Sequence, residues 1–228
     1  MVGDFEPREV LLLAEQTLKS WRGSSPPLGA SSAPGLPARA AVVTPPPPPK
    51  ILSSTSSQAR ATLLRFGCFL SAARGKRDAV IHTFITELAR ESLLKHLRVE
   101  RGVSYAQDVS ITHLRGGTSV FIGSVDLSPG TTDVGIELVK QSILGDALAA
   151  NPAAIEAARW RLARRSAMAY QDNARLARLL FDTWNLEWPL DAVDDLPQHL
   201  KTITADEIRN ALAPCASSAV ISTLAPKP

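Results

Sequence analysis

A proline-rich stretch divides this chain of 228 residues into two very unequal parts. Residues 23–57 hold nine of the 17 prolines, including the run from Pro45 to Pro49, and only two charged residues, Arg39 and Lys50. Proline runs favour an extended, semi-rigid conformation, whereas serine-rich sequence is flexible. The stretch is therefore predicted to be a linker, and a ligand for an SH3-type module is the less favoured alternative.

The short part before the linker, residues 1–22, predicts a strand end, a turn and one helix. Pro7 suits a first helical turn. Four apolar residues at helical spacing share one face: Val10, Ala14, Leu18 and Trp21. A lone amphipathic helix cannot bury such a stripe without a sheet to pack on. Residues 1–22 are therefore expected to be the last βα unit of a preceding domain.

The long part, residues 58–228, alternates between strand and helix patterns. Period-two alternation predicts strands over 62–70, 103–113, 119–127 and 218–223, with a turn at Arg115, Gly116 and Gly117. Helical spacing predicts helices over 78–99, 131–147, 151–168 and 173–184, and one from Thr204, where Glu207 completes a capping box. The sum is an α+β domain with one mainly antiparallel sheet covered by helices.

Charge and hydropathy exclude several classes of partner. Two of the three net positive charges lie in the linker, and no aromatic stacking pattern accompanies the cluster Arg159, Arg161, Arg164, Arg165, Arg175 and Arg178. We therefore expect a solvated helical face and no nucleic acid. The sequence has no run of 18 apolar residues, so no membrane span is predicted. The acidic N-terminus has no basic n-region of a signal peptide, so the compartment stays open between periplasm and cytoplasm.

The cysteines and histidines predict no metal site. Cys68 and Cys215 are interpreted as buried thiols, with a disulfide as the alternative if both lie on one sheet. His82, His96, His113 and His199 lack a second histidine three to five residues away, and neither H-E-x-x-H nor H-x-x-E-H occurs. Each histidine is expected at the surface or in a local bond. No nucleophile elbow or phosphate loop is present, so no catalytic residue and no cofactor are predicted in this chain.

One helix-to-strand corner, residues 97–105, offers donors for an extended peptide. Arg98 lies in the last helical turn and Tyr105 begins the next strand, beyond Gly102. A guanidinium and a phenol on the two sides of such a corner can donate to peptide carbonyls. Without further information, the plainer interpretation is favoured: Arg98 complements the helix dipole, and Tyr105 is an amphipathic strand residue.

Two segments carry a resemblance to a known family. The opening VGDFEPREVLLLAEQTLKSW and the corner LLKHLRVERGVSYAQ are similar to the insulinase/pitrilysin zinc metalloproteases, which include the mitochondrial processing peptidase. The resemblance implies that residues 58–228 form the non-catalytic C-terminal half of a clamshell. It also implies that Arg98 and Tyr105 hold the peptide substrate while zinc sits in a catalytic half, in the same full-length chain or a separate subunit. The chain alone would then be inactive.

Two other functions remain open. A non-proteolytic structural or assembly subunit can share this fold, and Arg98 and Tyr105 argue only weakly against it. A stand-alone module that recruits extended peptides to a sheet edge would bind peptide without any partner.

Overall fold

The structure is a computed structural model that describes residues 6–20, 50–114, 118–143, 151–169, 171–185 and 196–227. Its centre is a five-stranded sheet in the order β1-β5-β2-β4-β3. The strands are β1 (Lys50–Ser56), β2 (Thr62–Leu70), β3 (Ser104–His113), β4 (Ser119–Leu127) and β5 (Val220–Pro226). Only β1 and β5 pair in parallel; the other neighbours are antiparallel. The predicted α+β class with a mainly antiparallel sheet is confirmed.

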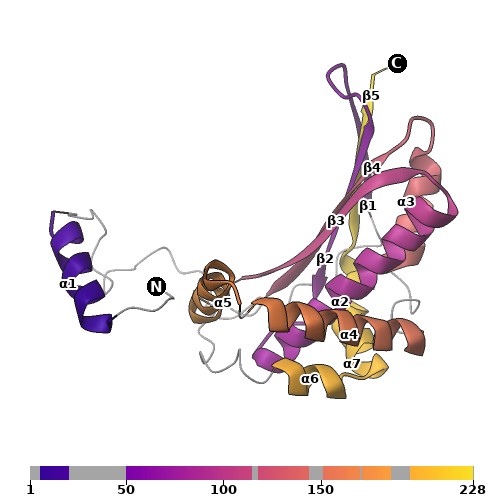
Figure 1. Cartoon of the computed structure of the whole chain (residues 1–228). Helices are drawn as coiled ribbons and strands as arrows, with labels where there is room; N and C mark the ends of the chain where they lie inside the picture. Colours follow the sequence, from indigo (N-terminus) through magenta and orange to yellow (C-terminus); the bar gives the residue numbers. More distant parts are fainter. Residues whose placement is uncertain are drawn as a thin grey trace.

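Helices cover one face of the sheet (Figure 1): α2, α3 and α7 contact its strands, and α4 packs on α2 and α6. The helical elements are α1 (Pro7–Leu18), α2 (Lys76–Leu93), the π-helix η1 (Leu94–Glu100), α3 (Thr132–Ile143), α4 (Pro152–Ala169), α5 (Asn173–Asn185), α6 (Leu196–Thr202) and α7 (Ala205–Ser218). The core lies between this layer and the sheet. Its largest fully buried side chains include Phe84, Phe121, Leu64, Leu97 and Ile208.

The alternation predicted for residues 62–70 places the central strand β2 correctly. Every second residue, starting with Thr62, is buried against the helices. Phe66 packs directly over the backbone of Gly123 on β4, where an added Cβ would lie 2.0 Å from the ring. Gly123 therefore makes room for the aromatic ring.

The first strand, β1, lies inside the stretch that the sequence assigns to a linker. It pairs with β5, with Lys50 opposite Val220 and Ser56 opposite Pro226. The sheet therefore begins before residue 58. The proposed division at residues 22 and 57 otherwise stays a prediction.

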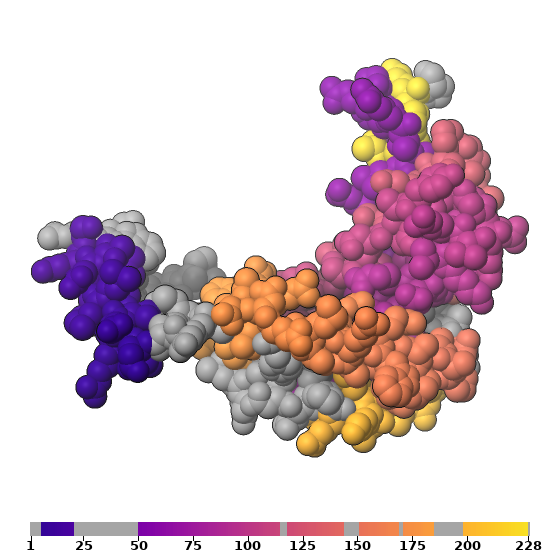
Figure 2. Space-filling model, in the orientation of Figure 1, coloured from indigo at the N-terminus to yellow at the C-terminus, as the bar shows by residue number. Residues whose placement is uncertain are grey.

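Helix α1 stands away from the sheet domain (Figure 2), and none of its residues is buried. The side chains of Leu11, Leu12, Leu13 and Leu18 are 50–63% exposed. This helix agrees with the pattern predicted around Pro7. The expected strand end at residues 1–5, Trp21, the turn at 115–117 and residues 144–147 lie outside the described residues.

Helix α6 has no counterpart among the predicted elements, and two arginines from other helices bind the carbonyls at its end. Arg77 of α2 donates to the carbonyl oxygens of His199 and Thr202. Arg159 of α4 donates to those of Leu200 and Ile203 at 2.9 and 3.1 Å. A seven-residue helix is too short to show a clear periodic pattern, and tertiary contacts supply partners for its last carbonyls.

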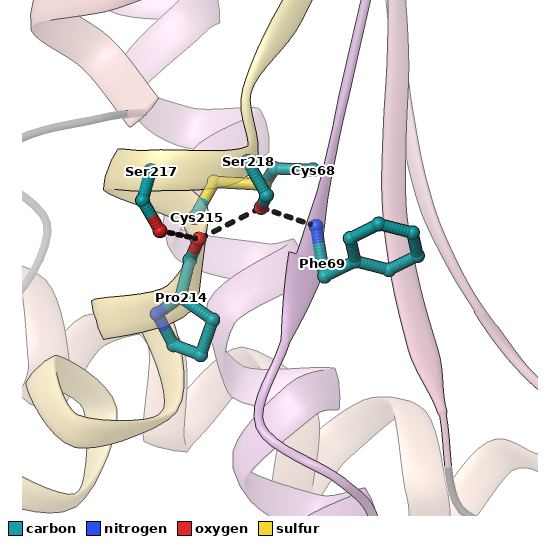
Figure 3. Close-up of a disulfide and its surroundings, with 6 residues drawn as sticks. All are labelled: Cys68, Phe69, Pro214, Cys215, Ser217 and Ser218. Carbon is teal, nitrogen blue, oxygen red and sulfur yellow. Dashed lines mark hydrogen bonds between the residues drawn. A yellow bond between two sulfur atoms is a disulfide. The ribbon is translucent and has the colours of Figure 1, made fainter. Parts of the chain in front are cut away.

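The two cysteines form a disulfide between β2 and α7 (Figure 3), so the interpretation as free buried thiols is wrong. The Cα atoms of Cys68 and Cys215 are 4.9 Å apart. Ser218 adds a second tie beside the disulfide, because its hydroxyl accepts from the Phe69 amide and donates to the Pro214 carbonyl. Cys215 lies on a helix and not on a strand, which the sequence pattern does not indicate.

None of the described helices is both long enough and apolar enough to cross a bilayer.

Candidate functional site

Helix α2 continues into the π-helix η1, which forms the corner predicted to carry Arg98. Leu97 is fully buried and fixes η1 on the core, while Arg98 beside it is exposed. Gly102 ends the helix at φ +62°, a conformation that favours glycine. The amides of Gly102 and Val103 donate back to the carbonyls of Arg98 and Leu97, at 3.2 and 2.8 Å. The backbone around Arg98 is thus held at both ends, and π-helical turns occur often at functional sites.

Tyr105 lies at an irregularity in the edge strand β3. Ser104 pairs with Leu127 and Ala106 with Asp126, so Tyr105 is the extra residue between two consecutive pairs. Such a bulge redirects a side chain away from the regular alternation. The side chain of Tyr105 is 78% exposed, which leaves its phenol accessible.

The structure brings both predicted residues to one hollow of about 310 Å³. The hollow is lined by Arg98, Tyr105, Ala106, Gln107, Asp108, Ser124 and Asp126. Its walls come from η1, β3 and β4, elements that the buried Leu97 and the strand pairing hold in place. A guanidinium, a phenol and two carboxylates in one open hollow are suited to binding a polar, extended chain.

Asp108 and Asp126 were missed by the sequence interpretation. Each lies at an outward position of a strand, opposite Ser124 and Ala106 respectively. Neither they nor Arg98 make an ion pair with any residue that the structure describes. A charged residue at an outward strand position is ordinary, so the sequence carries no signal until the register places the two side by side.

Most residues of the arginine cluster bind protein carboxylates or carbonyls. Arg161 and Arg165 contact the buried Glu87 at 2.7 and 3.0 Å. Arg175 pairs with Asp172, just before α5, and Arg178 pairs with Asp182 within α5. Arg159 binds Glu156 as well as the end of α6. These arginines serve contacts within the fold.

His82 contradicts the expectation that each histidine lies at the surface or in a local bond. It is fully buried, neither ring nitrogen has a hydrogen-bond partner, and its ring stacks on His113 at a centroid distance of 5.3 Å. Burial, together with the neighbouring His113, lowers the pKa of His82 to about 4, although Asp78 opposes the shift. Burial also lowers the pKa of His113, which contacts the Ser119 hydroxyl.

Across the described ranges, no three His, Cys, Asp or Glu side chains come together as a possible metal site.

Comparison with solved structures shows which proteins share the fold. A protease from Helicobacter pylori matches with a TM-score of 0.74 and 13% identity, over 99% of this chain and 54% of that one. The peptidase M16 inactive domain from Pseudomonas fluorescens matches at 0.65 and 15%, over 80% and 45%. The inactive peptidase domain of a putative zinc protease from Bordetella parapertussis matches at 0.60 and 15%, over 75% and 95%. The chain thus spans about half the length of the first two.

No curated protein sequence matches the chain. A family model described as the peptidase M16 inactive domain matches residues 1–162. That range includes α1, the sheet strands β1 to β4 and the corner that carries Arg98 and Tyr105. The chain therefore belongs to the peptidase M16 inactive domain family.

Proposed function

We propose that this chain is the substrate-binding half of a two-part zinc endopeptidase, in which Arg98 and Tyr105 hold the peptide beside the bond to be cut. The observation that carries the proposal is their convergence on one open hollow from different elements. The side chain of Arg98 is exposed and has no ion-pair partner among the described residues. It is therefore available to a ligand.

The roles of the two residues follow from their chemistry. The Arg98 guanidinium has several N–H donors in a fixed plane, which suits the carbonyl oxygens of an extended backbone. The Tyr105 phenol can donate to an oxygen on which negative charge develops during attack. The catalytic half, in the same full-length chain or a separate subunit, would hold the zinc that activates the attacking water.

Reconstitution with the zinc-bearing half tests this function. The chain alone should not cleave a quenched fluorescent peptide, and cleavage should appear when the zinc-bearing half is added. Arg98→Ala and Tyr105→Phe should each lower kcat/KM by about tenfold or more, since one lost donor to a developing oxyanion costs about that much or more.

The matched control is Arg101→Ala, which removes an exposed arginine from the same corner but outside the hollow. It should leave cleavage unchanged. Assembly of the two halves is followed by size-exclusion chromatography for every variant. Full activity of both Arg98→Ala and Tyr105→Phe would refute the proposed roles and favour a structural subunit.

A further inference from the structure

The sheet face opposite the helices carries a cluster of exposed apolar side chains. Phe69 on β2, Ile122 on β4 and Val220 on β5 are 44%, 45% and 41% exposed. Their strand neighbours Cys68, Phe121 and Ile221 point the other way, into the core. No described helix packs over this face (Figure 1), so the three side chains are available to a ligand.

The row of side chains on this face has a gap at Gly67, because glycine has no side chain. The strand register places Gly67 directly between Ile122 on one side and Val220 on the other. Directly opposed side chains in a sheet are about 5 Å apart at Cβ, and glycine leaves the middle of this row empty. A Cβ added to Gly67 would lie 3.9 Å from Cγ1 of Ile122, in ordinary contact. We call Gly67, Phe69, Ile122 and Val220 the apolar dent.

The apolar dent continues along β4 into the hollow of Arg98 and Tyr105. Ile122, Ser124 and Asp126 are alternate residues of β4 and therefore share one face. The four residue steps from Ile122 to Asp126 span roughly 13 Å, so an extended peptide covers this distance between two residues that are about four positions apart. One such peptide can therefore reach both places.

We infer that this face binds an extended peptide that presents a lysine or arginine to Asp108 and Asp126 and, about four residues away, a bulky apolar side chain to the apolar dent. This inference rests on the proposed function and adds the preferred substrate class. Arg98 and Tyr105 would hold the backbone, whereas the two aspartates and the dent would select side chains.

Charge complementarity decides the class of ligand. Asp108 on β3 and Asp126 on β4 lack ion-pair partners in the described part of the chain. The hollow therefore holds two carboxylates and the one guanidinium of Arg98, with Arg65 of β2 outside its lining, and this excess of negative charge favours a cation over phosphate. A nucleic acid or an anionic lipid surface is therefore disfavoured at this place. The dent is flanked by three apolar side chains and gains from burying a fourth.

Fluorescence anisotropy with defined peptides tests the inference on the full 228-residue chain. The probe is a labelled peptide of Ser, Thr and Ala that carries one lysine and one leucine four positions apart, made in both orders. In the better-bound order, replacing lysine by glutamine should weaken binding by about twofold to fivefold, and by glutamate further, since an exposed charge pair contributes up to about 1 kcal/mol. Replacing leucine by serine should weaken it by a similar factor.

Variants of the chain assign each preference to its residues. Asp108→Asn combined with Asp126→Asn should abolish the preference for lysine over glutamine and leave the glutamine peptide bound as before. Gly67→Val should fill the dent and abolish the preference for leucine, and Ile122→Ser should do the same by removing one wall. Glu137→Gln is the charge-matched control, because Glu137 is exposed on α3. It should change neither preference.

The outcomes separate this inference from the proposed function. If the lysine and glutamine peptides bound equally and Arg98→Ala weakened both, the selection by Asp108 and Asp126 would be overturned. The peptide-holding role of Arg98 would stay intact. If both Gly67→Val and Ile122→Ser still preferred the leucine peptide, the assignment of the leucine preference to the apolar dent would be overturned. No binding of any probe at millimolar chain, with a folded circular dichroism spectrum, would overturn both.

Discussion

Single residues in this fold differ sharply in how much change their surroundings tolerate, and two glycines on adjacent strands illustrate it. Gly123 faces the helices under the ring of Phe66, and Gly67 faces the open side of the sheet. Both are strand positions where an alanine would otherwise favour folding slightly. The two positions should therefore differ in their tolerance of alanine only because the space around them differs.

Gly123→Ala should lower the free energy of unfolding by about 2 kcal/mol or more, because its Cβ would lie 2.0 Å from Phe66 and the ring must move inside a packed core. Gly67→Ala is the control, since its nearest contact is 3.4 Å, and it should leave stability unchanged or slightly higher. Urea unfolding followed by circular dichroism measures both. Equal stability of the two variants would contradict this account of the packing.

The buried His82 should make the domain sensitive to acid. The folded state holds the pKa at about 4, below its ordinary value of 6.5, so the unfolded chain binds the proton first as the pH falls. Stability is complete above about pH 6.5 and declines as the pH drops towards 4, by up to about 3 kcal/mol from this group. Denaturant unfolding at several pH values measures the slope.

His82→Phe should reduce that slope and leave the part due to His113, whose pKa is also lowered. Asp78 is the carboxylate that opposes the shift of His82, so Asp78→Asn should lower the pKa of the folded state further and extend the decline in stability to lower pH. An unchanged pH dependence in His82→Phe would show that other groups set the acid limit.

At the scale of elements, a buried carboxylate joins helices α2 and α4. Glu87 is 1% exposed and contacts Arg90 on its own helix and Arg161 and Arg165 on α4. Removing a buried charge leaves its partners uncompensated, which costs more than the pair itself contributes. The arrangement fixes one helix on the other at a defined position.

Glu87→Gln should lower the free energy of unfolding by about 1–3 kcal/mol, because three guanidinium groups lose the negative charge that they share, although the amide keeps one acceptor oxygen. The arginines are 36–54% exposed, so solvent screens part of the loss. A double-mutant cycle with Arg161→Leu should give a coupling energy well above that of the exposed pair Asp206 and Arg209, which should be about 0.5 kcal/mol or less. Similar coupling in the two pairs would show that burial does not strengthen the Glu87 contacts.

Elements with strong local patterns could be predicted from the sequence, and those held by distant contacts could not. Strand β2 shows clear alternation from Thr62 to Leu70, and the capping box of Thr204 and Glu207 forms at the start of α7. Strand β1 lies in serine-rich sequence and exists through pairing with β5. Helix α6 is similar, since its terminal carbonyls depend on two arginines from other helices.

The candidate site divides in the same way. Arg98 and Tyr105 were predicted as site residues from the family resemblance of one short segment, since the residues alone favoured the plainer interpretation, and both line one hollow. Asp108 and Asp126 belong to different strands, and only the register of β3 on β4 brings them together. The apolar dent needs three strands, one of them from the far end of the domain.

At the scale of the whole molecule, the disulfide closes a loop of 147 residues that contains most of the domain. Cross-linking so long a loop reduces the entropy of the unfolded chain, an effect of about 5 kcal/mol in the chain-entropy model and often less in practice. Cys68 and Cys215 are 5% and 1% exposed, so reductants reach them slowly while the domain is folded.

Cys68→Ser with Cys215→Ser should therefore lower the free energy of unfolding by about 2–5 kcal/mol, and a reductant should change the midpoint of the wild type but not of the double variant. Ser218→Ala is the control, because it removes the neighbouring hydrogen bonds and keeps the disulfide. Calorimetry with and without reductant makes the comparison. If a reductant present throughout unfolding left the wild-type midpoint unchanged, the proposed stabilisation by the disulfide would be contradicted.

The position of β5 has a consequence for how the domain is made. Val220–Pro226 is synthesised after every other strand of the sheet, yet it lies between β1 and β2 and hydrogen-bonds to both. While the ribosome is still adding residues before Val220, β1 has no neighbour and β2 has one open edge. The sheet can close only after its last strand has been translated. Because such long-range pairing is slow, a nascent chain would expose the gap between β1 and β2 to chaperones until then.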